Sequence, residues 1–188
     1  KRQVLYEKSV PQLMIENGLG RHVYGQDFYT DDPLHMNDIQ EALFDTEYWK
    51  AGDVFLSLRN ISAIVLYRPS TNEIVWIKQG PWVNQHDVDI LTEHKISVFN
   101  NNSKDFVTGN VVDGHNEVII YDFKENKYTS YLAESLNKNG VRTITAGRSE
   151  ILPNGDLLIE ETNYARTLYF NSDGTLKWSH VNRANDGK

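Results

Sequence analysis

The run Asp53-Val-Phe-Leu-Ser-Leu58 is followed by Ala63-Ile-Val-Leu-Tyr67 and, after the turn Pro69-Ser-Thr-Asn72, by Glu73-Ile-Val-Trp-Ile77. This stretch decides the fold. The three runs are rich in β-branched and aromatic residues, which favour strands, and turn-forming residues separate them. Closely spaced runs of this kind predict antiparallel strands in an all-β protein.

The same pattern occurs twice more along the chain. The second copy has runs at 95–99, 117–121 and 128–130, and the third has runs at 156–160, 167–170 and 176–178. One further short run precedes each copy, at 35–39, 86–90 and 147–151. Four strands that recur about every 50 to 60 residues are typical of the blades of a β-propeller.

The repeats define the expected domain organisation. Three four-stranded blades are predicted at about residues 31–80, 81–135 and 143–182, and together they make up a propeller domain at 31–182. Residues 1–30 are predicted to be a connecting segment or the tail of a preceding blade. Because a propeller closes with roughly four to eight blades, we expect further blades from residues outside this chain or from another chain.

Composition excludes several classes of function. The chain has 26 acidic against 19 basic residues and a net charge of −7, a balance that argues against nucleic acid as a partner. No stretch approaches the roughly 20 apolar residues of a membrane-spanning helix, so no membrane span is expected. The absence of cysteine excludes disulfides, thiolate catalysis and cysteine-based zinc sites.

Histidines stand at the start of two predicted inner strands. His35 and His86 occupy the same position in their repeats, since each is followed three residues later by aspartate and four residues later by isoleucine. The innermost strand of each blade lines the central channel of a propeller. We therefore expect the two imidazoles to face a common cavity.

Three short elements accompany these histidines in a fixed order. They are His35-Met-Asn37, Ser57-Leu-Arg59 and Gln85-His86. Within the matching repeat, they resemble the His-x-Asn, Ser-x-Arg and Gln-His elements of the bacterial arylsulfotransferase family. The stretches 152–159 and 173–178 are also similar to later blades of that family, so the resemblance covers about residues 31–182.

The resemblance implies a fold, an activity and a location. The family's members are six-bladed propellers of the bacterial cell envelope, which implies a periplasmic or secreted protein. They move a sulfuryl group from an aryl sulfate donor to a phenolic acceptor without a nucleotide sulfate donor. The resemblance therefore implies neither a cofactor nor a metal ion. Residue by residue, His86 is similar to the histidine that becomes sulfated. His35, Asn37 and Arg59 resemble the groups that bind and polarise the sulfate oxygens.

Physical chemistry agrees with these roles. A neutral imidazole is a competent nucleophile near pH 7, and a covalent intermediate divides one difficult displacement into two easier steps. Arg59 and Asn37 offer the charge and the donors that sulfuryl oxygens need, and a protonated His35 can act as general acid. Trp82 is predicted to pack against an aryl ring of the substrate. Arg148 is predicted either to bind substrate from the channel wall or to form a salt bridge with a neighbouring blade.

Two other interpretations stay open. A propeller without catalysis can serve as a binding or assembly module. Asp38, Asp87 and Asp89 suggest a metal-dependent hydrolase, because histidine and carboxylate ligands suit zinc and other divalent ions; strand alternation, however, places Asp38 and His35 on opposite faces. The family's further active-site histidine has no matched counterpart, since His22, the sole histidine upstream of His35, lies outside a blade-like strand.

Overall fold

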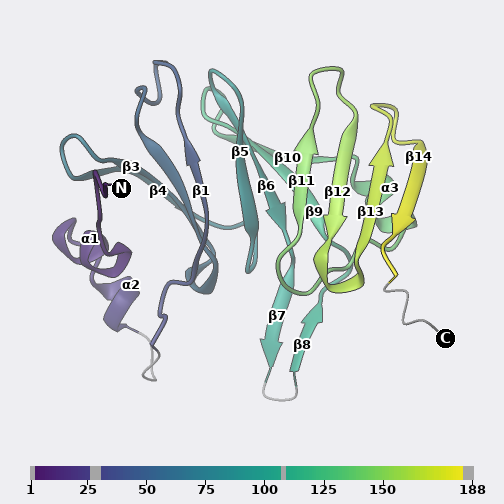
Figure 1. Cartoon of the computed structure of the whole chain (residues 1–188), viewed down its shortest axis with the longest axis horizontal. Coiled ribbons are helices and arrows are strands. Elements are labelled where there is room, and N and C mark those ends of the chain that lie inside the picture. Colours follow the sequence, from purple (N-terminus) through teal and green to yellow (C-terminus); the bar gives the residue numbers. More distant parts are fainter. Residues whose placement is uncertain (1–2, 26–30, 107–108, 184–188) are drawn as a thin grey trace.

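The computed structural model describes residues 3–25, 31–106 and 109–183 of the chain. Its strands form three four-stranded antiparallel sheets and one two-stranded hairpin. The three larger sheets lie side by side in chain order (Figure 1). This arrangement confirms the predicted all-β fold with three four-stranded propeller blades in the chain.

The first sheet contains β1 (Met36–Glu41), β2 (Val54–Leu58), β3 (Ala63–Arg68) and β4 (Glu73–Gln79). The second contains β5 (His86–Thr92), β6 (Lys95–Asn100), β9 (Glu117–Asp122) and β10 (Lys127–Tyr131). The third contains β11 (Arg148–Ile151), β12 (Leu157–Glu161), β13 (Arg166–Phe170) and β14 (Leu176–Val181). Each predicted run lies in one of these strands, with ends that differ by up to three residues.

Several short elements were outside the sequence prediction. They are the hairpin of β7 (Ser103–Phe106) and β8 (Gly109–Val112), and the helices α1 (Val10–Glu16), α2 (Arg21–Tyr24) and α3 (Ala133–Lys138). Elements of four to seven residues are too short to show a clear periodicity. Two of the helices lie within residues 1–30, whose assignment as a connecting segment or blade tail stays a prediction. Among the described residues, no helix is long and apolar enough to cross a bilayer.

Apolar side chains between the sheets form the core. Ile64 of β3 lies in one buried cluster with Ile96 and Val98 of β6, between the first and second sheets. A separate cluster that includes Phe99 and Leu157 fills the space between the second and third sheets. The middle strands of the second sheet are therefore covered on both faces, which explains their continuous apolar sequences.

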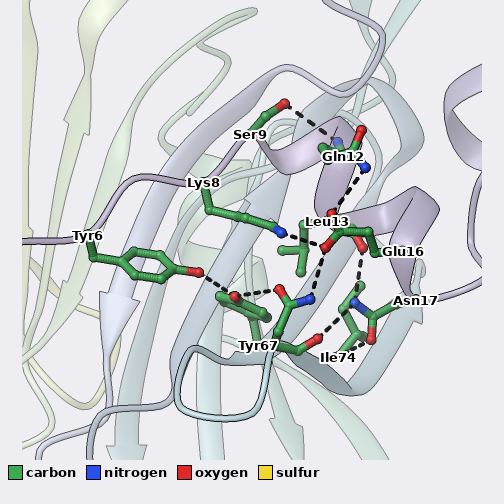
Figure 2. A network of polar contacts seen from close by, with 10 residues as sticks. Tyr6, Lys8, Ser9, Gln12, Leu13, Glu16, Asn17, Tyr67 and Ile74 are labelled. Carbon is green, nitrogen blue, oxygen red and sulfur yellow. Dashed lines mark hydrogen bonds and ion pairs between the residues drawn. The ribbon is translucent and has the colours of Figure 1, made fainter.

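Polar contacts fasten the segment before the first sheet to that sheet (Figure 2). The side-chain amide of Asn17 donates a hydrogen bond to the Asn72 carbonyl at 3.1 Å, and Glu16 accepts one from the Asn72 side chain at 2.9 Å. The hydroxyl groups of Tyr6 and Tyr67 are also hydrogen-bonded to each other. Helix α1 is held by these contacts and covers apolar side chains of the first sheet that lie outside the cluster shared with the second.

The packing between sheets can be tested at Phe55. This side chain of β2 is 0 % exposed, and its ring packs edge-on against Trp49 with 5.4 Å between centroids. We expect Phe55→Ala to lower the free energy of unfolding by about 3 to 5 kcal/mol, because it leaves a cavity in a close-packed core. Leu43→Ala, at a side chain 76 % exposed, should lower it by about 0.5 kcal/mol or less. Urea denaturation followed by circular dichroism measures both, and equal losses would contradict the core assignment.

Candidate active site

Two β-bulges shape the inner strands of the first two sheets. The pairing of β1 with β2 skips Asn37, and the pairing of β5 with β6 skips Asp87. Asp87 has a left-handed backbone conformation with a φ of 53°. Successive side chains normally alternate across a strand, but a bulge re-aims the residues around it. His86 and Asp87 consequently line one cavity although they are neighbours in sequence.

This cavity has a volume of about 300 Å³ and lies where the inner strands of the three sheets meet. Asn37 lines it from β1, His86 and Asp87 line it from β5, and Arg148 lines it from β11. A second cavity of about 320 Å³ shares Asp87 and Arg148 with the first. Three of the residues predicted for the site, Asn37, His86 and Arg148, thus lie at one cavity.

Hydrogen bonds fix the tautomer of His86. The Nδ2 of Asn101 donates to the carbonyls of Ala146 and Thr143, at 2.7 and 3.2 Å, so its Oδ1 is the atom that faces His86. That oxygen lies 2.6 Å from Nδ1 of His86 and can only accept, which assigns the ring proton to Nδ1. Nε2 then carries the lone pair, and it accepts the Ala146 backbone N–H at 3.1 Å.

The surroundings of His86 keep its ring neutral. Burial lowers its pKa from the ordinary value, the hydrogen bond to Asn101 raises it, and the charges of Arg59 and His35 lower it. The net direction is downward. At neutral pH the Nε2 lone pair is therefore available as a nucleophile.

The structure places His35 differently from His86. His86 is the first residue of β5 and pairs with Phe99, whereas His35 precedes β1 and has a φ of 50°. The expectation that the two histidines hold the same blade position is therefore wrong. The side chain of His35 is 48 % exposed, and its Nδ1 lies 2.6 Å from Asp32 Oδ2. His35 is not among the described residues that line the cavity, although it lowers the pKa of His86 through its charge.

The remaining predicted residues differ in their surroundings. Arg59 is buried at the start of a short 3-10 helix after β2, and its Nη1 donates to Asn60 Oδ1 at 3.1 Å. Asn37 donates to the Gln85 carbonyl at 2.8 Å. Trp82 is 1 % exposed in the core, and its ring N–H donates to a backbone carbonyl at 2.9 Å. Trp82 thus packs in the core between the first two sheets, away from the lining of the cavity, and its predicted contact with an aryl ring is not part of the proposed site.

Inner-strand carboxylates connect neighbouring sheets. Asp38 accepts the Val88 N–H at 2.8 Å, and Asp87 accepts the Ser149 N–H at 2.7 Å. The pKa of Asp87 is raised to about 7, chiefly by burial; the hydrogen bond from Ser149 lowers it, the charges of Asp89 and Asp38 raise it, and the charge of Arg148 lowers it. Burial also raises the pKa of Asp89 to about 6, with Asp38 as the next cause. The cavity wall therefore holds carboxyl groups that titrate near neutral pH.

A metal site would need at least three suitable ligands close together. Among the described residues, no group of three or more histidine, aspartate or glutamate side chains is arranged to hold a metal ion. Asp38, Asp87 and Asp89 repel one another through their charges but do not converge as a ligand set. The geometry of these residues gives the metal-dependent interpretation no support.

Comparison with known families adds an independent observation. The sequence profile described as "Arylsulfotransferase (ASST)" matches residues 1–183, which is nearly the whole chain. The chain belongs to the arylsulfotransferase family. Among curated proteins, a comparison finds no match to this sequence.

Solved structures with a similar backbone come from three bacteria. They are virginiamycin B lyase from Staphylococcus aureus (13% identity, TM-score 0.45), a functionally unknown protein from Desulfotomaculum acetoxidans (16%, 0.48) and apo AztD from Citrobacter koseri (11%, 0.40). The matches cover 78%, 82% and 69% of this chain and 41%, 47% and 32% of those chains. This arylsulfotransferase-family chain thus spans less than half the length of each.

One recurring position around the site was missed by the sequence prediction. The residue directly after the second strand of each sheet is polar, and these residues are Arg59, Asn101 and Thr162. Asn101 holds the His86 ring, while Thr162 lines the cavity and accepts the Gly147 N–H at 3.1 Å. The repeat contains the information needed to find Asn101 and Thr162, because Arg59, a predicted site residue, holds the same position in the first sheet.

The hydrogen bond between Asn101 and His86 raises the pKa of the imidazole against the larger, lowering effect of burial. We expect Asn101→Asp to raise the pKa of His86, because a negative charge next to Nδ1 stabilises the imidazolium. Asn101→Ala removes the acceptor and should lower the pKa of His86 below its wild-type value. An NMR titration of the His86 ring protons measures these shifts, and identical titration curves in all three proteins would contradict the tautomer assignment.

The raised pKa of Asp87 predicts a pH-dependent effect on stability. The fold disfavours the charged carboxylate, so the wild-type protein loses stability as the pH rises from about 4 to about 7. Asp87→Asn removes this loss. We expect the variant to match the wild type at pH 4 and to exceed it at pH 8 by about 4 kcal/mol. Urea denaturation at the two pH values measures the difference, and a difference independent of pH would contradict this account.

Proposed function

We propose that the protein transfers a sulfuryl group from an aryl sulfate to a phenolic acceptor through a sulfated His86. The observation that carries the proposal is the state of the His86 ring. The ring is neutral, its proton is held on Nδ1 by Asn101, and its lone pair on Nε2 belongs to a residue that lines a polar cavity. Family membership supports an arylsulfotransferase-like function in general.

The reaction proceeds in two displacements. Nε2 of His86 attacks the sulfur of the aryl sulfate, and the bond between sulfur and the aryl oxygen breaks. In the second step the oxygen of the acceptor phenol attacks the same sulfur, and the bond to Nε2 breaks. The Ala146 N–H must release Nε2 as the sulfur approaches, and it is then placed to donate to a sulfuryl oxygen.

The described lining of the cavity offers one positive charge and several hydrogen-bond donors to a sulfate group, beside the carboxyl groups of Asp38, Asp87 and Glu160. Arg148 lines the cavity beside His86, and Asn37 lines it from the neighbouring sheet. Arg59 and His35 lie close enough for their charges to act on the His86 ring. We assign Arg148 and Asn37 to the sulfuryl oxygens, and Arg59 to the positive charge that offsets the neighbouring carboxylates.

The proposal also includes the remainder of the propeller. Because the chain spans less than half the length of the similar solved structures, we expect further blades to complete the channel and contribute the rest of the aryl binding surface. A position outside the cytoplasm, as the resemblance to the bacterial family implies, belongs to the same proposal.

Replacement of His86 tests the mechanism. With 4-nitrophenyl sulfate as donor and phenol as acceptor, we expect His86→Ala to reduce transfer by on the order of 10³-fold or more, because the covalent route is lost. The wild-type protein, mixed with donor alone, should gain the mass of one sulfuryl group on the peptide that contains residue 86. His94→Ala, at a histidine between β5 and β6, is the control and should retain full transfer.

Two outcomes would refute the proposal. Normal turnover by His86→Ala would exclude the nucleophile, and turnover without any sulfated peptide would exclude the covalent intermediate. Wild-type protein that transfers nothing would favour a binding or assembly module instead.

A further inference from the structure

The cavity wall contains a carboxyl group that the two displacements above leave unused. We propose that Asp87 is the general acid–base of the sulfuryl transfer, which protonates the departing phenolate and later deprotonates the incoming phenol. The inference rests on the proposed function of His86. It replaces the role in proton transfer that the sequence suggested for His35.

Backbone geometry brings Asp87 to the reacting group. A regular strand would turn Asp87 away from His86, but the bulge after His86 and the left-handed φ of 53° turn both side chains to the same cavity. The Ser149 N–H holds one carboxyl oxygen, Oδ2, at 2.7 Å. The other oxygen, Oδ1, has no hydrogen-bond partner among the described residues, so it can carry the proton that is exchanged.

The charges around Asp87 suit a group that both gives and takes a proton. Burial disfavours the ionised form, the Ser149 N–H favours it, Asp89 and Asp38 repel the negative charge, and Arg148 attracts it. The resulting pKa of about 7 means that the acid and the base coexist at neutral pH. Proton transfer is most effective when the catalytic pKa lies near the working pH.

His35 fits this role less well. Its imidazole is about half exposed and its Nδ1 contacts Asp32, at a position before β1. It does not belong to the described lining of the cavity that contains His86 and Asp87. Its charge contributes to the potential at the site, whereas Asp87 shares the cavity with the nucleophile.

The proton balance closes over the two steps. In the first, Nε2 bonds to sulfur, the bond between sulfur and the aryl oxygen breaks, and the phenolate takes the proton of Asp87, which leaves a carboxylate. In the second, the carboxylate takes the proton of the acceptor phenol, whose oxygen bonds to sulfur while the bond to Nε2 breaks. Asp87 and His86 return to their starting forms, and no other reactant is needed.

Two donors that differ in leaving group separate this role from a structural one. 4-Nitrophenolate is a weak base and leaves without a proton, whereas the phenolate released by phenyl sulfate needs one. We expect Asp87→Asn to sulfate His86 from 4-nitrophenyl sulfate within about 3-fold of the wild-type rate, and from phenyl sulfate about 10² to 10⁴-fold more slowly. Mass spectrometry of the peptide that contains residue 86, after rapid quenching, measures both rates.

Asp89→Asn is the matched control. It makes the same change two residues along β5, at a carboxyl group that also has a raised pKa but lines only the adjoining cavity. Because the charge of Asp89 helps to raise the pKa of Asp87, Asp89→Asn should move the fall of the phenyl sulfate rate to lower pH. At pH 5 this variant should sulfate His86 at the wild-type rate from both donors. His35→Asn tests the rival group, and a donor-dependent loss in that variant instead of Asp87→Asn would overturn the proposal.

The wild-type pH profile gives a test that needs no variant. With phenyl sulfate, the rate of His86 sulfation should fall as the pH rises through about 7, because the acid form of Asp87 is lost. With 4-nitrophenyl sulfate this fall should be absent. The same fall with both donors would overturn the proposal.

The outcomes distinguish the two proposals of this work. If Asp87→Asn slows His86 sulfation equally with both donors, Asp87 has a structural role. If the variant keeps the wild-type rate with both donors, Asp87 takes no part in the reaction. Either result overturns the proposal for Asp87 and leaves the proposal for sulfated His86 in place. If the wild-type protein forms no sulfated His86 from either donor, the proposed function fails and this inference fails with it.

Discussion

The second sheet of this protein has two apolar faces, and the need to cover both of them determines the rest of the structure. Ile64 and Val98 lie in the layer between the first two sheets, and Phe99 and Leu157 lie in the next layer. A sheet that must be covered on both sides can stack only face to face with others like it. This stacking brings the inner strands together, since β5 contacts both β1 and β11. The cavity is thus a consequence of hydrophobic packing that takes place away from it.

Polar groups at this junction serve the fold and the chemistry together. The carboxylate of Asp87 holds the Ser149 N–H of the next sheet, and the amide of Asn101 holds two backbone carbonyls before it reaches His86. When one polar atom of a carboxyl or amide group is held by a hydrogen bond, the group has little freedom to rotate, so its other polar atom points in one direction. The turn that contains Ala146 completes the arrangement through its contact with Nε2. Preorganised groups of this kind are the ones that stabilise developing charge efficiently.

The strands could be predicted from the sequence because each middle strand is a short apolar run between turn residues, as in the stretch from Asp53 to Ile77. The short helices and the β7–β8 hairpin could not, because they lack such a period. At the site, the sequence predicted His86 and Asn37 from the family resemblance and Arg148, as one of two alternatives, from the repeat; the structure brings all three to one cavity. The orientation of Asp87 could not be foreseen, because the alternation rule assumes a regular ladder and a bulge breaks it. Its place beside His86 in the cavity lining therefore depends on backbone geometry that residue types do not reveal.

The polar residue after the second strand of each sheet has a broader meaning. Arg59, Asn101 and Thr162 stand at corresponding ends of three successive blades, next to but outside the apolar layers. None of the three side chains belongs to the apolar clusters, and the three blades use a guanidinium, an amide and a hydroxyl group at this position. The blades thus share one kind of apolar core and differ in the polar residue at this position. The chemistry of the cavity can therefore change during evolution while the apolar layers between the blades are kept.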